Sequence, residues 1–160
     1  MKKYIKTVCN YLLVAALLIM LTMVEKSVLA PFVLLRISVV ICICFCLANP
    51  GVHSVATSAF CGFFADIYSC NMPVCSLLYL YISSGCVWSV RQFVSVEEKT
   101  VFLICFFALL IFGAGEFLLH LLFGGSFFPD LKQLFMYTAF ALTNAWYSPI
   151  VYGILKRVQF

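Results

Sequence analysis

Four ionisable residues interrupt long apolar stretches of this sequence: Arg36, Asp66, Glu116 and His120. An ionisable group in an apolar environment is costly, so it normally pairs with an opposite charge, binds a solute or ion, or transfers protons. Glu116 and His120 are four residues apart and share one face of a helix. Arg36 is the natural partner for Asp66 or Glu116. We expect a structural tie between helices, with a ligand site and proton or catalytic chemistry as the alternatives.

The composition indicates what must position these residues. Hydrophobic residues make up 65% of the chain and charged residues only 10%, and the mean hydropathy is +1.12. Soluble globular proteins average about 45–50% apolar and about 25% charged residues. The sequence therefore predicts an all-α integral membrane protein, with residues 1–160 forming a single polytopic membrane domain.

Apolar runs between polar breaks predict the individual spans. A spanning helix needs roughly 20 apolar residues, which leaves room for a bundle of about six. The predicted spans are Val8 to Val24, Val28 to Ala48, Val52 to Ile67, Val74 to Val90, Thr100 to Phe123 and Leu131 to Leu155. The first also resembles a secretory signal peptide, with a Val-x-Ala ending at Ala30. Pro31 directly after Ala30, and the charged pair Glu25 and Lys26, favour a retained span.

The basic residues predict the orientation, because they are retained on the cytoplasmic side of a membrane. With both termini cytoplasmic, the outer side carries only Lys26 and Lys132. The cytoplasmic side then carries Lys2, Lys3, Lys6, Arg91, Lys99, Lys156 and Arg157. These residues flank helices and form no dense run, so we expect no nucleic-acid partner.

The third predicted span contains a stripe of small residues. Ser54, Ser58, Gly62 and Asp66 recur every four residues, which lets another helix backbone approach closely. At about 1.5 Å per residue, Asp66 and Glu116 both lie about 22–24 Å into a core of about 30 Å, in its outer third. We expect Asp66 to end this stripe and to face protein.

The last predicted span carries Asn144 near its middle and Pro149 near its cytoplasmic end. Asn144 is expected to hydrogen-bond across helices. Pro149 removes a backbone hydrogen bond and is expected to kink the helix. Together with the stripe, these two residues form the predicted packing or partner interface.

The nine cysteines do not predict a metal site. In "CICFC", residues two apart point about 200° from each other, so only Cys42 and Cys46 share a face, and that pair cannot supply four zinc ligands. Cys70 and Cys75 bracket an outer turn and could pair in an oxidising compartment. No phosphate-binding loop, dinucleotide fingerprint or catalytic motif is present. We therefore expect a non-enzyme without cofactor or metal.

Three segments resemble the family of the rod shape-determining membrane protein MreD. They are "AFCGFFADIYSCNMPVCSLLYLYI" with Gly62 and Asp66, "ALTNAWYSPIVYGILKRVQF" with Asn144 and Pro149, and "APFVLLRISVV" with Pro31. Pro73 stands where the family usually has glycine, and Arg36 has no counterpart in the pattern.

The resemblance implies a non-enzymatic inner-membrane subunit of the bacterial cell-elongation machinery for peptidoglycan synthesis. It would bind an MreC-like membrane protein and, directly or through it, MreB and peptidoglycan synthases. The implied fold is a six-helix bundle similar to the substrate-binding S subunits of energy-coupling factor vitamin transporters.

Such an S subunit is the main alternative function, with Arg36, Asp66, Glu116 and His120 as its ligand pocket. S subunits carry small residues four apart on the first span for docking, whereas Ala15 and Ala16 are adjacent here. A membrane enzyme or proton channel is the third interpretation.

Overall fold

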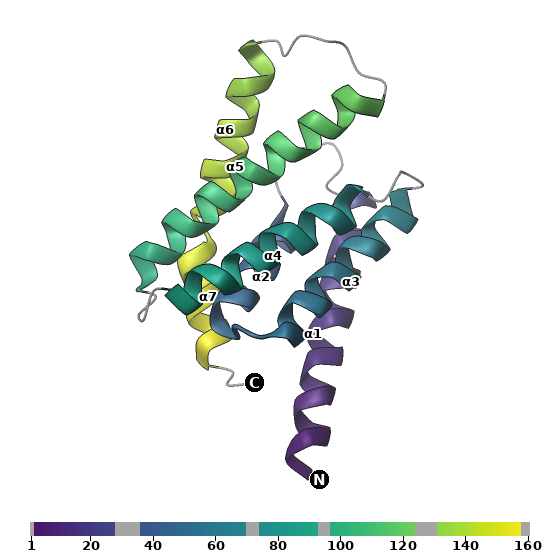
Figure 1. Cartoon of the computed structure of the whole chain (residues 1–160), viewed down its shortest axis with the longest axis vertical. Helices are drawn as coiled ribbons and strands as arrows, with labels where there is room; N and C mark the ends of the chain where they lie inside the picture. The colour runs from purple at the N-terminus through teal and green to yellow at the C-terminus, as the bar shows by residue number, and fades with distance from the viewer. Residues whose placement is uncertain (1, 28–35, 70–73, 93–96, 124–130, 158–160) are drawn as a thin grey trace.

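The computed structural model describes residues 2–27, 36–69, 74–92, 97–123 and 131–157, and these residues form seven α-helices and no strand (Figure 1). The helices are α1 (Lys2–Ser27), α2 (Ile37–Ala48), α3 (Val52–Ser69), α4 (Val74–Gln92), α5 (Glu98–Phe123), α6 (Leu131–Ala145) and α7 (Ser148–Arg157). The all-helical prediction is confirmed for this part of the chain. Among the described residues, no helix combines the length and the apolar character needed to cross a bilayer.

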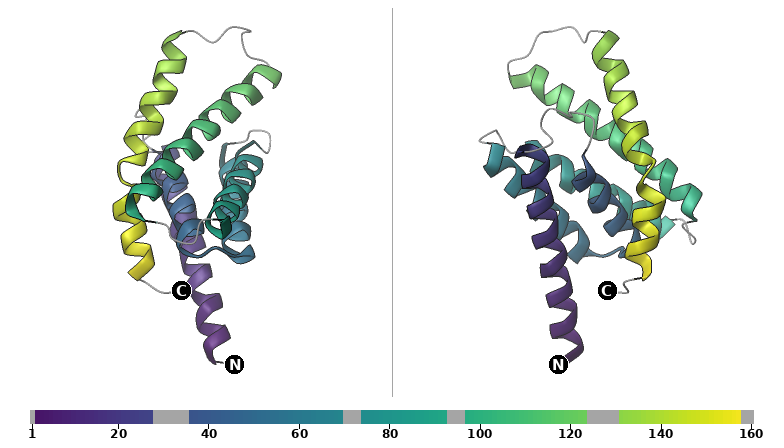
Figure 2. Two further views of the ribbon diagram at one scale, coloured as in Figure 1. Left: turned by 60° about the vertical axis from the view of Figure 1, so that its left-hand side comes forward. Right: turned by 180° about the vertical axis from the view of Figure 1, so that it is seen from behind.

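The helices run back and forth, so that α1 begins and α7 ends at the same end of the bundle (Figure 1). The short link between α2 and α3 lies towards this end, and the far ends of α5 and α6 project from the opposite one. Figure 2 shows the same arrangement from two further sides. This order agrees with the alternation of the predicted spans.

The short helix α2 forms the centre of the bundle. It has 12 residues and contacts every one of the other six helices. A helix that is apolar on all sides is normally buried, and "ISVVICICFCLA" is such a sequence. Residues from Ser38 to Leu47 are accordingly buried, apart from the half-buried Ile41. The prediction began this span at Val28, but the helix begins at Ile37; residues 28–35 lie outside the described part.

The predicted last span consists of two helices, because the chain leaves helical geometry at Trp146 and Tyr147, between α6 and α7. Pro149 lacks an N–H group, so it cannot donate to the Ala145 carbonyl four residues earlier, and the helical hydrogen-bond pattern is interrupted there. Side chains satisfy main-chain groups at this break: the Ser148 hydroxyl donates to the Ala145 carbonyl over 2.7 Å. The Cys44 thiol of α2 donates to the Ser148 carbonyl over 3.4 Å.

Helices α3 and α4 approach each other closely at Gly62. A Cβ atom added there would lie 2.8 Å from the Ser76 Cα atom and 2.9 Å from the Cys75 carbonyl oxygen. Both are backbone atoms of α4, which cannot move aside independently of the helix. Only glycine therefore allows the two backbones to pack at this distance.

Candidate functional site

Asp66 caps the N-terminus of a neighbouring helix. Its side chain is only 5% exposed near the end of α3. Its Oδ1 atom accepts a hydrogen bond from the Cys75 N–H, and its Oδ2 atom from the Ser76 N–H, both over 2.8 Å. The first N–H groups of a helix have no partner within it and carry partial positive charge. The carboxylate therefore stabilises the start of α4 and fixes it against α3.

Glu25 has the same role at the start of α2. Its Oε1 atom accepts from the Ser38 N–H over 2.7 Å, and its Oε2 atom accepts from the Ser38 hydroxyl over 2.5 Å. The Ser38 hydroxyl also lies 3.3 Å from the Tyr79 hydroxyl of α4. The network thus joins α1, α2 and α4. The sequence analysis assigned Glu25 only to the end of the first span. The signal that it missed is an acidic residue near the end of one helix, shortly before the start of the next helix.

Asn144 completes the cap of α2 from a third helix. Its side chain is fully buried on α6. The Oδ1 atom accepts from the Arg36 N–H over 2.9 Å, and the Nδ2 group donates to the Phe140 carbonyl over 2.8 Å. Asn144 therefore bonds across helices, at a main-chain group that an apolar residue could not satisfy.

The predicted pairing of Arg36 with Asp66 is not formed. Both Asp66 oxygens accept main-chain N–H groups of α4, whereas the half-buried Arg36 guanidinium lies over the Phe112 ring, 5.6 Å from its centroid. Its charge also acts on Glu25. The backbones of Glu116 and His120 belong to α5, but their side chains lie outside the described residues. Of the predicted cluster, the pair of Arg36 and Asp66 is therefore not formed, and the predictions for Glu116 and His120 stay predictions.

The stripe of small residues lies on the buried face of α3. Ser54 is fully buried, Ser58 is 1% exposed, and Gly62 and Asp66 are buried as well. The Ser58 hydroxyl lies 3.3 Å from the Cys46 thiol of α2. The stripe therefore contacts α2 through Ser58 and α4 through Gly62 and Asp66.

The α2 cysteines point towards different neighbours, as the helical spacing predicts. Cys42 and Cys46 face α3, where their thiols contact Cys61 and Ser58. Cys44 points away from them, towards Ser148 and Cys105. Within the part of the chain that the structure describes, no three Cys, His, Asp or Glu side chains gather as a metal site. These thiols pack and donate weak hydrogen bonds within an apolar core.

Burial raises the pKa of the Glu25 carboxyl above its ordinary value of 4.5, and the hydrogen bonds from Ser38 and the charge of Arg36 oppose this rise only in part. Glu25 lies just beyond the predicted first span. Because its pKa is raised, its carboxyl group keeps its proton to higher pH in the folded protein than in the unfolded chain. As the pH rises from about 4.5 through the raised pKa, the unfolded chain loses the proton first, and the folded state loses stability.

Glu25→Gln is expected to abolish this pH dependence. Glutamine has nearly the same shape; its amide oxygen can accept from the Ser38 N–H and its amide nitrogen can donate to the Ser38 hydroxyl. The measurement is thermal unfolding of both proteins in detergent between about pH 4 and pH 8. We expect the wild type to lose stability relative to the variant as the pH rises. A difference that does not change with pH would contradict this role of Glu25.

Every buried side-chain nitrogen and oxygen atom among the described residues has a hydrogen-bond partner. The acids and the asparagine bind chiefly main-chain groups at helix ends, so the arrangement as a whole fixes where helices begin. No family model, curated protein or solved structure matches this chain.

Proposed function

We propose that this chain is a multi-pass protein of the bacterial cytoplasmic membrane with both termini on the cytoplasmic side. The distribution of its side chains supports this location. Large apolar side chains cover the outside of the bundle, among them Leu12 (64% exposed), Phe107 (59%) and Phe135 (76%). Polar side chains such as Asp66 and Asn144 are buried and hydrogen-bonded. An extensive apolar surface is unfavourable in water, but it is the expected surface of a protein in lipid.

Within that membrane, the chain acts as a non-enzymatic scaffold subunit of the cell-elongation machinery. It binds an MreC-like partner and, directly or through it, MreB and the peptidoglycan synthases. The observation that carries this proposal is the use of Asp66, which lies in the segment that resembles MreD. Both of its oxygens are occupied by the N-terminus of α4, whereas a catalytic or ligand-binding carboxylate must reach its substrate. The segment thus has a structural task, which suits an assembly protein.

Co-purification from native membranes tests this proposal. The tagged chain is extracted in mild detergent, and the bound proteins are identified by mass spectrometry, with an unrelated tagged multi-pass protein as control. We expect an MreC-like protein or a peptidoglycan synthase, absent from the control. Recovery of an ATPase with its coupling subunit would contradict the scaffold and indicate a transporter S subunit. Recovery of neither class would also contradict it.

A further inference from the structure

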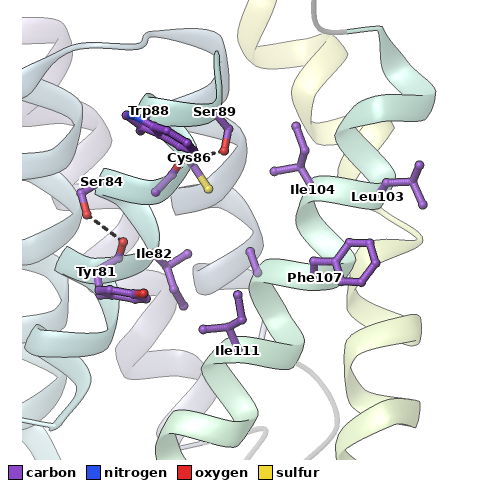
Figure 3. A pocket seen from close by; sticks show the side chains of 12 residues that line it. Tyr81, Ile82, Ser84, Cys86, Trp88, Ser89, Leu103, Ile104, Phe107 and Ile111 are labelled. Carbon is purple, nitrogen blue, oxygen red and sulfur yellow. Dashed lines mark hydrogen bonds between the residues drawn. The ribbon is translucent and has the colours of Figure 1, made fainter. Parts of the chain in front are cut away.

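An open groove of about 710 Å³ runs between α4 and α5 (Figure 3). On the α4 side it is lined by Tyr81, Gly85 and Trp88, and on the α5 side by Leu103, Phe107 and Ile111. None of these residues belongs to the polar network that caps the helices. The groove is therefore separate from the site described above.

The lining of the groove is hydrocarbon in character. The two serine side chains in it bond to their own helix: the Ser84 hydroxyl donates to the Tyr81 carbonyl and the Ser89 hydroxyl to the Gly85 carbonyl, each over 2.8 Å. Figure 3 shows the first of these bonds beside the groove. The other lining side chains are aliphatic, aromatic or a thiol. The groove therefore suits an apolar occupant.

The large side chains that line the groove favour a narrow occupant over a second helix. Tyr81 is 69% exposed, Trp88 64% and Phe107 59%. Close packing of helices in a membrane needs small residues along the contact, and a helix with its side chains is about 10–12 Å wide. Tyr81 and Trp88 lie on either side of Gly85 along α4, so they hold a helix away from the groove floor. A single flexible acyl chain can enter between them.

Charged groups lie at one end of the groove. Arg91 follows Trp88 by three residues and Ser84 by seven, so it continues the groove-lining face at the end of α4. Glu97, just before α5, is also exposed. Neither side chain has an ion-pair or hydrogen-bond partner in the described ranges. A cation and an anion together complement a zwitterionic headgroup, in which the phosphate binds the arginine and the ammonium group binds the glutamate.

We propose that this groove binds one acyl chain of an aminophospholipid such as phosphatidylethanolamine, with the headgroup at Arg91 and Glu97. The inference rests on the proposed membrane location but not on the identity of any protein partner. The bound lipid would fill the space between α4 and α5 and hold the two helices in register.

Fluorescence quenching by brominated lipid tests the proposal. The chain has two tryptophans, so Trp146→Phe leaves Trp88 as the only one. This protein, in detergent micelles, is titrated with phosphatidylethanolamine that carries bromine on its acyl chains. We expect saturable quenching of Trp88. Double replacement of the charged pair, Arg91→Gln with Glu97→Gln, should weaken the apparent affinity by about tenfold, equivalent to about 1.4 kcal/mol.

Gly85→Leu provides the variant that fills the groove. An added Cβ at Gly85 meets no atom within 4 Å, and the same holds for Gly153 on α7. Both Gly85→Leu and the control Gly153→Leu should therefore fold. We expect saturable quenching to disappear in Gly85→Leu and to persist in Gly153→Leu. If circular dichroism shows that Gly85→Leu is misfolded, Ser84→Leu fills the same groove from an exposed position.

The proposal would be overturned if quenching of Trp88 rises without saturation, or if it is equal in Gly85→Leu and Gly153→Leu. In either case the lipid would contact Trp88 only as bulk solvent. Native mass spectrometry of the same samples detects the rival occupant. A dimer that is lost in Gly85→Leu would place a second copy in the groove and would also overturn it. Neither result affects the co-purification of an MreC-like partner, and failure of that co-purification leaves the lipid titration unaffected.

Discussion

Asp66→Ala is expected to lower the free energy of unfolding by about 2–4 kcal/mol. The substitution removes the carboxylate oxygens that accept from the N–H groups of the half-buried Cys75 and Ser76, and losing the partner of a polar group away from water costs about 1–3 kcal/mol. It also removes a negative charge from the positive end of α4. The measurement is equilibrium unfolding of the purified protein in mixed detergent micelles.

Asp66→Asn and Thr138→Ala are the comparisons. Asparagine keeps one acceptor oxygen but loses the charge, so its stability should lie between those of the wild type and Asp66→Ala. Thr138 is exposed on α6 and its hydroxyl donates to the Phe135 carbonyl of the same helix, so Thr138→Ala should not lower the stability. If Asp66→Ala is as stable as Thr138→Ala, the carboxylate does not cap α4 as described.

Gly62→Ala is expected to destabilise the bundle by about 1–3 kcal/mol, the usual cost of overpacking. The new Cβ would lie 2.8 Å from the Ser76 Cα atom and 3.0 Å from the Tyr79 Cβ atom, so α4 must move away from α3. That movement also draws the start of α4 away from Asp66. The effects of Gly62→Ala and Asp66→Ala should consequently be non-additive when they are combined.

Gly153→Ala is the control for Gly62→Ala, measured by the same unfolding experiment. No atom lies within 4 Å of a Cβ added at Gly153, and alanine is favoured over glycine in a helix by about 1 kcal/mol. Gly153→Ala should therefore be neutral or stabilising. Equal effects of the two substitutions would show that helix propensity, and not the contact between α3 and α4, decides the outcome.

The sequence predicted the helical segments because apolar runs and polar breaks are local features. The stripe from Ser54 to Asp66 was also readable, because a repeat of four residues places side chains on one helix face. The stripe is buried in the structure because its small residues let α2 and α4 approach α3.

The partners of the polar residues could not be read in the same way. The sequence offered Arg36 as a partner for Asp66 or Glu116, but it does not show which helices are neighbours. That prediction also overlooked the main chain as a partner. Helix α2 begins only at Ile37, so the first N–H groups of this buried helix have no acceptor within it. Glu25 and Asn144 accept from the Ser38 and Arg36 N–H groups from two other helices. Such acceptors are chosen by tertiary packing, which a hydropathy pattern does not contain.

Both buried carboxylates in the described residues accept hydrogen bonds at helix starts, and we propose that they hold these helix ends and not a ligand. Amide hydrogen exchange at Cys75 and Ser76, compared between the wild type and Asp66→Ala in detergent, tests it most directly. We predict that both amides exchange slowly in the wild type and much faster in the variant, while exchange in the centre of α2 changes far less. Equal exchange of these two amides in both proteins would contradict the claim and would return Asp66 to the candidates for ligand binding.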